Sequence, residues 1–262
     1  MSEDKIIGRK DGGVGEIIFN NPAKRNAVSL DMWEHVTALL TDYAADPNLR
    51  VVVLSGTGGK AFVSGADISK FESERATKEA VERYNAISKG AYNQLATFPK
   101  PTIAKINGYC IGGGMNIAAG CDLRYCEEGA RFAIPAGRLG LGYGYVGVHR
   151  LSRIVGISRA PEMFSSARQI SAQEADDLGL VNAVVKVEDL DQHVAELAAR
   201  ITENAPLTIA TIKAVAIEMG KAPDQPDHAK LDRMVLDCFE SEDYIEGRRA
   251  FMEKRKPQFK GK

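Results

Sequence analysis

Two turns rich in glycine and small residues are the first candidates for chemistry in this sequence. The first, Phe62–Ile68, comes after the apolar run Val51–Leu54. The second, Asn107–Gly114, comes after Thr102–Ile106. Glycine lets a ligand approach the main chain closely, and free amides at a helix start favour developing negative charge. We therefore predict a backbone oxyanion hole built from these turns.

The glycine triplet Gly112–Gly114 has two other interpretations. It could simply let a helix pack tightly on a strand, which is the usual meaning of an isolated triplet. It could also belong to a dinucleotide-binding loop, but the G-x-G-x-x-G spacing is absent and no acidic residue follows a second strand at the usual distance. A nucleotide cofactor is therefore not predicted, whereas the packing interpretation stays open.

Length and charge narrow the class of protein. The chain has 262 residues, enough for one large domain with or without a small appendage, and its net charge of -1 creates no field that attracts nucleic acid or anionic lipid. It contains no apolar run of membrane-spanning length, and Met1–Lys10 lacks the pattern of a secretory signal. We expect a cytoplasmic protein with neither nucleic acid nor membrane as a partner.

The cysteines and histidines do not form a metal-binding pattern. The sequence has no C-x-x-C pair and no histidine at zinc-finger spacing from a cysteine, so no metal site is predicted. Three of the four cysteines lie in apolar surroundings, which favours buried free thiols; the four are Cys110, Cys121, Cys126 and Cys238.

Strands and helices alternate through most of the chain, which indicates an α/β architecture. The opening reads as a hairpin of Lys5–Arg9 and Gly15–Phe19, and Ser29 can cap a helix that ends before Pro47. Ser171 with Glu174 forms a capping box. Further elements are predicted at Val51–Leu54, Thr77–Phe98, Thr102–Ile106, Met115–Gly120, Leu123–Cys126, Arg131–Ile134 and Val181–Val187.

The last part of the chain changes character. We predict a spiral core over residues 1–189 and a helical segment over 190–262, because strand patterns disappear after about Leu190. The segment carries more apolar surface than a free tail tolerates, so it must pack on its own core or on a neighbouring subunit. Its apolar residues include Met234, Leu236, Phe239, Phe251 and Phe259.

A series of short motifs runs through nearly the whole chain: Asn21-Pro22 with Asn26-Ala27, Ser64-Gly65-Ala66-Asp67-Ile68, Asn107-Gly108 with Gly112-Gly113-Gly114, Cys121-Asp122, Phe132-Ala133, Arg150-Leu151 and Leu178-Gly179-Leu180-Val181. In order and spacing these motifs resemble those of the crotonase (enoyl-CoA hydratase/isomerase) superfamily. The resemblance implies a ββα spiral core, a C-terminal helical trimerisation segment, and a homotrimer or a hexamer formed as a dimer of trimers.

Carried over by position, the amides of Ala66 and Gly113 correspond to the family's oxyanion pair. The resemblance implies that the substrate is an acyl-CoA, with coenzyme A bound as part of it and no separate cofactor. Lys24 and Arg25 lie where the family's loop meets the nucleotide, and Ala27, Asp67 and Ile68 join them as substrate-binding candidates. Lys254, with Arg255 and Lys256, could add a basic patch, contributed by the same or a neighbouring subunit, or could be merely solvated.

The sequence departs from the family's hydratases at the positions that handle protons. Asn116 and Ala136 stand where those enzymes carry glutamates, and Gly144 stands where isomerase and dehalogenase relatives carry an acid. Alanine cannot move a proton, and asparagine does not titrate. Hydration by the two-glutamate route is therefore predicted to be crippled.

A pocket with few acids suits a substrate that brings its own carboxylate. Decarboxylation of a malonyl-type thioester needs chiefly an oxyanion hole for the enolate. Tyr143 and the run Val146–His149 also resemble the methylmalonyl-CoA decarboxylase-like members, although Ala66 and Asn116 depart from them. We therefore favour an acyl-CoA carbon–carbon lyase, with Tyr143 and Asn116 as catalytic candidates.

Two other functions stay open, as do other roles for the pocket residues. The chain could be an enoyl-CoA hydratase or isomerase that uses another acid such as Asp67, or an acyl-CoA-binding protein without catalysis. Arg138 and His149 are substrate-binding candidates, but Arg138 could pair with a surface acid and His149 could be structural. Tyr143 could be an aromatic plug, and Asn116 a hydrogen-bonding core residue.

Overall fold

A six-stranded sheet forms the centre of the molecule. The computed structural model describes residues 4–70, 76–221 and 225–262. The predicted hairpin is confirmed as an antiparallel pair at the sheet's edge, and the other strands run parallel. The sheet has the order β1 (Ile6–Asp11), β2 (Val14–Phe19), β3 (Val51–Gly56), β5 (Thr102–Ile106), β7 (Leu123–Glu127), β10 (Ala183–Val185).

A second, four-stranded sheet lies beside the first. Three of its strands each follow a strand of the large sheet, so the chain winds through both sheets in every repeat and the predicted ββα spiral is confirmed. Its order is β4 (Ala61–Val63), β6 (Tyr109–Ile111), β8 (Arg131–Ala133), β9 (Ile170–Ser171). We predicted only glycine-bearing turns where β4 and β6 lie, because three residues carry too little periodicity to identify a strand.

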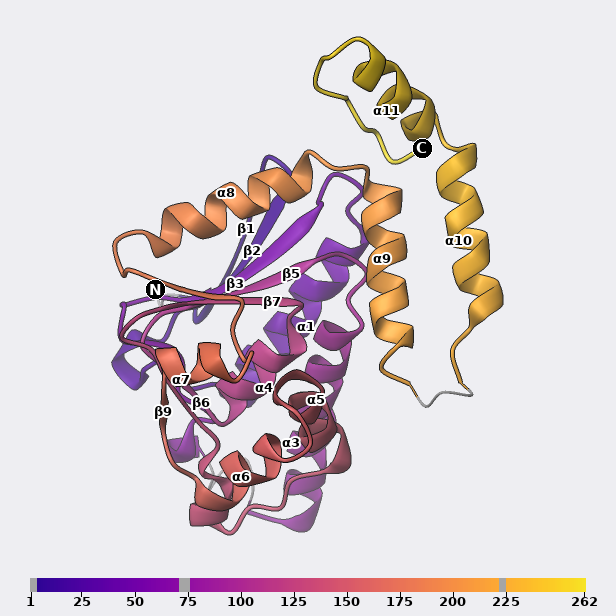
Figure 1. Ribbon diagram of the computed structural model, residues 1–262. Helices are drawn as coiled ribbons and strands as arrows, with labels where there is room; N and C mark the ends of the chain where they lie inside the picture. The colour runs from indigo at the N-terminus through magenta and orange to yellow at the C-terminus, as the bar shows by residue number, and fades with distance from the viewer. Residues whose placement is uncertain (1–3, 71–75, 222–224) are drawn as a thin grey trace.

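Helices cover both faces of the large sheet (Figure 1). One face packs with the small sheet and helices α1, α3 and α4 around Phe19, Phe62 and Phe132. The helices of the core are α1 (Leu30–Ala45), α3 (Lys78–Ala96), α4 (Gly113–Gly120), α5 (Tyr145–Val155), α6 (Arg159–Ser166), α7 (Ala172–Asp177) and α8 (Leu190–Thr202), with 3₁₀ turns η1 (Pro22–Lys24), η2 (Ile68–Lys70) and η3 (Pro135–Leu139).

The helix α8 covers the other face of the large sheet. It buries Leu190, Val194 and Ala198 against Val51 and Ile103. The part of the predicted C-terminal segment that leaves the sheet therefore begins after α8.

The last two helices project from the body (Figure 1). Helix α9 (Pro206–Glu218) stays beside the core, where the buried Lys213 bonds to Asp122. Helix α10 (His228–Glu240) buries none of its residues, and α11 (Glu242–Met252) follows it outward. Phe239 is 58% exposed and Phe251 is 84% exposed, which confirms the predicted apolar surface.

The cysteines are free thiols, as predicted. Cys110, Cys121 and Cys126 are buried and Cys238 is partly exposed. Burial raises the pKa of Cys121 and of Cys126 to about 12. Within the described residues, no group of His, Cys, Asp or Glu side chains is arranged to hold a metal ion, and no helix is long and apolar enough to cross a membrane.

Candidate active site

Two backbone amides without partners lie together where the sheets meet α4. The Val28 amide donates to the Gly65 carbonyl at 2.8 Å and the Asp67 amide donates to the Val28 carbonyl at 2.9 Å. Because strand residues alternate in direction, the Ala66 amide between them faces away from Val28. Gly113 opens α4, so its amide precedes the helix's own ladder. Neither amide donates a hydrogen bond to any residue in the described ranges.

Close backbone packing places these amides side by side. A Cβ atom added to Gly113 would lie 3.6 Å from the carbonyl carbon of Gly65, which is bonded to the Ala66 nitrogen. A Cβ atom on Gly65 would lie 3.9 Å from the Gly113 nitrogen. Gly65 also has a φ of 115°, a conformation that side chains rarely adopt. Two adjacent free amides can stabilise one oxyanion.

The loop after β2 packs against this turn and brings the predicted coenzyme A residues to it. Lys24 Nζ donates to Asp67 Oδ2 at 2.8 Å and to Ser69 Oγ at 2.6 Å. The Arg25 carbonyl accepts from the Ser64 amide at 3.1 Å, and the Arg25 guanidinium lies 5.2 Å from the centre of the Tyr109 ring.

Ala27 and Ile68 both lie near Ala66, but they differ in exposure to solvent. Ala27 is buried where the loop turns into the bridge at Val28, whereas Ile68 is 60% exposed at the start of η2. The structure therefore brings the predicted loop residues together around Ala66, although the roles assigned to them stay predictions.

Asn26 holds this loop, a role that the sequence analysis did not assign. It is fully buried and has a φ of 57°, which asparagine tolerates better than most residues. Its Oδ1 accepts from the Asn21 amide at 2.9 Å, while its Nδ2 donates to the carbonyls of Thr57 at 3.0 Å and Ala61 at 2.8 Å. Asn26 thereby fixes the segment that carries Lys24 and Arg25.

Asp67 should make stability depend on pH. Burial opposes its ionisation, but hydrogen bonds from Lys24 and Ser69 outweigh burial and lower its pKa. A carboxylate whose pKa is lowered by folding stabilises the protein above its unfolded pKa, about 3.9, and loses this effect as pH falls through the folded value. We expect wild type to unfold at a higher midpoint concentration of urea than Asp67→Asn at pH 7. The difference between the two midpoints should shrink below about pH 4. A constant difference down to pH 2.5 would contradict this.

Asn116 and Tyr143 form a polar pair next to the amides. Asn116 lies in the first turn of α4, and its Nδ2 donates to Tyr143 Oη at 2.8 Å. The Tyr143 ring packs on Phe164 with 4.7 Å between ring centres, and both side chains line the same cavity. Burial raises the pKa of Tyr143 to about 12, so its phenol stays protonated near neutral pH.

A second tyrosine, Tyr92 on α3, lies at the same place and was missed in the sequence. A Cβ atom added to Gly113 would lie 3.0 Å from the Tyr92 hydroxyl oxygen. Burial raises the pKa of Tyr92 well above its usual value, with a smaller contribution from Tyr143, and the Asn116 side chain opposes this shift.

The cavity beside Tyr143 contains no acid. It measures about 310 Å³, and no described carboxylate lines it. Ala136 is buried in its wall, at one of the two positions where a glutamate was expected from the family's hydratases. Its lining consists of Ala136, Gly137, Leu141, Tyr143, Val148, Pro161, Phe164 and Ser165.

Two predicted substrate-binding residues, Arg138 and His149, lie outside this cavity. Arg138 is exposed at the end of η3 and has no hydrogen bond or ion pair with any residue in the described ranges. His149 stacks on Tyr145, with 5.2 Å between ring centres, and lines a different cavity with Arg150. The roles of Arg138 and His149 stay predictions.

The basic residues that follow α11 are mostly paired within the chain. Lys254 is exposed and has a φ of 54°. Arg255 pairs with Glu246 at 2.6 Å and Lys256 with Glu203 at 2.9 Å. A role for Lys254 in binding coenzyme A therefore also stays a prediction.

The fold is a ββα spiral that holds two adjacent free amides. Comparisons of the chain with known proteins identify its family. Residues 9–262 match the family model described as enoyl-CoA hydratase/isomerase, and the chain belongs to this family. It is 35% identical to the short-chain-enoyl-CoA hydratase of Clostridium acetobutylicum, over 98% of this chain and 97% of that protein. It is also 35% identical to the crotonyl-CoA hydratase of Syntrophomonas wolfei, over 99% of each.

A solved structure gives the same result. The chain matches an enoyl-CoA hydratase/carnithine racemase from Magnetospirillum magneticum with a TM-score of 0.94 and 33% identity, over 100% of this chain and 97% of that one. The predicted superfamily is therefore confirmed. The finer resemblance to decarboxylase-like members is not shown, because these relatives are named as hydratases or as a hydratase/racemase.

Proposed function

We propose that this chain is a hydro-lyase or isomerase of enoyl-CoA thioesters, whose chemistry passes through an enolate at the thioester. The observation that carries the proposal is the pair of free amides at Ala66 and Gly113. Both can donate to the same thioester oxygen, and such donors act most strongly on charge that develops in the transition state. The names of the relatives favour this reaction class over the carbon–carbon lyase preferred from the sequence.

Coenzyme A binds through the loop after β2 in this proposal. Lys24 and Arg25 are the cations next to the oxyanion pair, and the Arg25 side chain makes no ion pair with any described acid. An exposed guanidinium can bind phosphate through paired hydrogen bonds. Lys24 is already paired with Asp67, so it serves mainly to hold the loop against the turn at Ala66.

Proton transfer must proceed without the two glutamates of the family's hydratases. Asn116 and the protonated Tyr143 can orient a water molecule, but neither is an effective base at neutral pH. We therefore expect slow hydration of crotonyl-CoA. Asn116→Glu together with Ala136→Glu would supply the missing carboxylates and should accelerate hydration at least about 100-fold, the low end of the usual contribution of acid–base catalysis.

Decarboxylation of a malonyl-type thioester is the second candidate. The specific observation in its favour is the cavity beside Tyr143, whose described lining has no carboxylate to repel a charged substrate. The Tyr143 phenol could donate to the substrate carboxylate and hold the breaking bond perpendicular to the thioester plane.

A panel of thioesters separates the candidates. We would incubate the protein with crotonyl-CoA, malonyl-CoA and methylmalonyl-CoA, follow the products by mass, and include a free fatty acid as a binding control. Enzymatic hydration or double-bond migration supports the proposal, and loss of carbon dioxide supports the second candidate. Binding of thioesters without turnover would instead indicate an acyl-CoA-binding protein.

Tyr143→Phe gives the sharpest contrast within this panel. Losing one hydrogen bond to a charged group should slow decarboxylation about 10- to 150-fold. Binding of an uncharged acyl-CoA should hardly change. If this variant left decarboxylation untouched, Tyr143 would not hold the substrate carboxylate.

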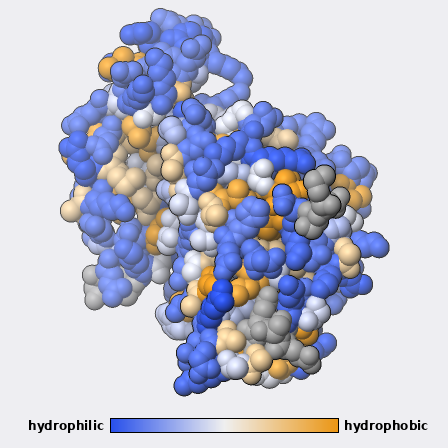
Figure 2. Space-filling model, turned by 180° about the vertical axis from the view of Figure 1, so that it is seen from behind, coloured by the Kyte–Doolittle hydropathy of each residue, from blue (hydrophilic) through white to orange (hydrophobic). Residues whose placement is uncertain are grey.

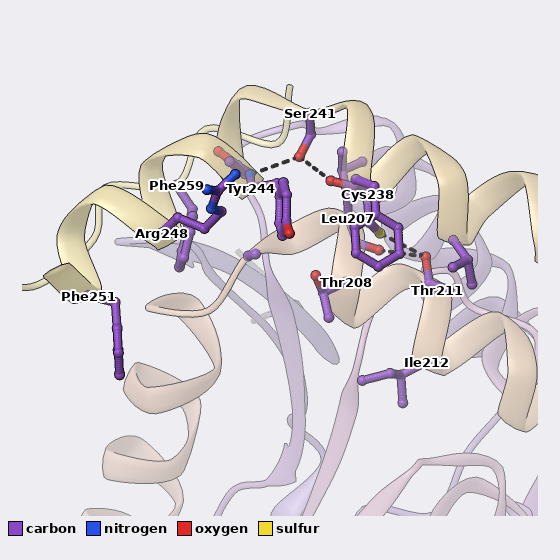
Figure 3. A pocket seen from close by; sticks show the side chains of 15 residues that line it. Leu207, Thr208, Thr211, Ile212, Cys238, Ser241, Tyr244, Arg248, Phe251 and Phe259 are labelled. Carbon is purple, nitrogen blue, oxygen red and sulfur yellow. Dashed lines mark hydrogen bonds between the residues drawn. The ribbon is translucent and has the colours of Figure 1, made fainter.

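We also propose that the projecting helices assemble the chain into a homotrimer or a dimer of trimers. A cavity of about 610 Å³ between α9 and the last two helices is lined mainly by apolar side chains, including Leu207, Ile212 and Phe251 (Figure 3). Pale and orange surface appears where this extension faces the body, whereas its outer surface is mostly polar (Figure 2).

The assembly proposal predicts a change in mass. Phe239→Glu with Phe251→Glu should convert the oligomer to smaller species in light scattering, because a charge on a buried apolar interface is costly. Lys230→Glu, on an exposed position of α10, serves as a charged control. A wild-type protein that is monomeric at micromolar concentration would contradict the proposal.

A further inference from the structure

We propose that Tyr92 is a third hydrogen-bond donor to the thioester oxygen, beside the amides of Ala66 and Gly113. This inference deepens the proposed function and rests on a thioester binding at the amide pair. Nothing in the spacing of the sequence marks Tyr92 for such a role, because it belongs to the helix between the two glycine-bearing turns and to neither turn.

The reach of the phenol fits a shared acceptor. The Tyr92 hydroxyl oxygen lies 3.0 Å from the Cβ position of Gly113. Since the nitrogen of a residue is about 2.5 Å from its own Cβ, the Tyr92 oxygen and the Gly113 nitrogen are at most about 5.5 Å apart. One oxygen atom can accept from two donors at this separation, since each hydrogen bond spans about 2.7–3.0 Å.

Two glycines of α4 create this proximity. A Cβ atom on Gly113 would approach the Tyr92 hydroxyl, and a Cβ atom on Gly120 would lie 3.3 Å from Leu95 Cδ2. Gly113 and Gly120 are seven residues apart and share one face of α4, and Tyr92 and Leu95 are three apart and share one face of α3. The two helices therefore pack closely along these faces. The Tyr92 ring is also held by Trp33, at 4.7 Å between ring centres with the planes at 65°.

The chemistry of the site suits a neutral donor. The Asn116 side chain makes a hydrogen bond to the Tyr92 hydroxyl that lowers its pKa, as a donor to the phenol oxygen does, so this bond leaves the phenol proton for a ligand. A phenol that stays protonated donates to the thioester oxygen without repelling the charge of the enolate. The alternative is that Tyr92 only packs on Trp33, in which case its oxygen atom would be dispensable.

A chromophoric ligand tests the role without requiring turnover. The absorption of 4-dimethylaminocinnamoyl-CoA moves to longer wavelength when its thioester carbonyl is polarised. Wild type should produce this shift on binding, and Tyr92→Phe should reduce it by about one third, as expected when one of three comparable donors is lost. The same variant should lower kcat/KM about 10- to 150-fold for a thioester that wild type converts.

The control is Tyr125→Phe. Tyr125 packs on His193, on the side of the large sheet covered by α8, and should leave both readouts unchanged. Tyr92→Phe removes a single oxygen and keeps the ring on Trp33, so an unchanged melting temperature would show that the fold is retained. A shift in wild type that persists in full in Tyr92→Phe, with unchanged kcat/KM, overturns the role of Tyr92. No shift in wild type overturns the proposed function itself.

Discussion

Gly113→Pro is expected to lower kcat/KM for an acyl-CoA thioester about 100- to 1,000-fold relative to Gly113→Ala, the range found when one oxyanion-hole donor is removed. Both variants place a Cβ atom 3.0 Å from the Tyr92 hydroxyl. Only proline removes the amide hydrogen. Proline is also favoured at the first position of a helix, which Gly113 occupies in α4, so the fold should tolerate it.

Circular dichroism and melting temperature would verify that both Gly113 variants fold alike. Steady-state kinetics with the best thioester of the panel then measures the effect of replacing the amide N–H by the proline ring. Equal activity of the alanine and proline variants would mean that the Gly113 amide does not touch the reacting carbonyl.

Gly114→Ala should destabilise the protein by about 3 kcal/mol and lower its melting temperature by about 6–12 °C. A Cβ atom at this position would lie 2.1 Å from the carbonyl oxygen of Val63 in β4. Neither atom can move without separating α4 from the small sheet. The amide pair spans the same junction, so activity should fall as well.

Gly90→Ala is the matched control for this prediction. Gly90 lies exposed inside α3, with no atom within 4 Å of its Cβ position. Alanine there should stabilise the protein by about 0.5–1 kcal/mol, because it restricts the unfolded chain and favours the helix. If thermal denaturation showed the same change for both variants, close packing at Gly114 would not be the reason for its effect.

Gly113 and Gly114 show what the sequence could predict. The turns at Phe62–Ile68 and Asn107–Gly114 were recognised from residue type and from their position after buried strands, and the structure joins them through Gly65 and Gly113. The packing interpretation of the triplet also holds, because Gly114 permits close contact with β4. Close packing and the proposed chemistry thus fall on neighbouring residues of a single triplet.

Tyr92 and Asn26 show what the sequence could not predict. Tyr92 follows the core position Ala91 in a long amphipathic helix, and its approach to Gly113 depends on how α3 packs against α4. Asn26 was part of a recognised motif, but two of its three hydrogen bonds reach Thr57 and Ala61, which are distant in sequence. Helical and strand periodicity identifies the buried face of an element and leaves its partners undetermined.

The proposed reaction depends on which side chains can move a proton. Ala136 lines the cavity and Asn116 bonds to Tyr143 in its wall, and neither side chain titrates, so the residues proposed to polarise a carbonyl were easier to identify than those that would move a proton. Backbone amides are set by the fold, whereas an acid or base can come from any nearby segment.

The most direct test of the account is a crystal structure of the protein with a bound acyl-CoA such as acetoacetyl-CoA. The account predicts that the thioester oxygen lies about 2.7–3.1 Å from the nitrogen atoms of both Ala66 and Gly113, with the phosphates near Arg25. A thioester oxygen bound away from both amides, or an acyl chain lodged in the cavity between α9 and α11, would contradict it.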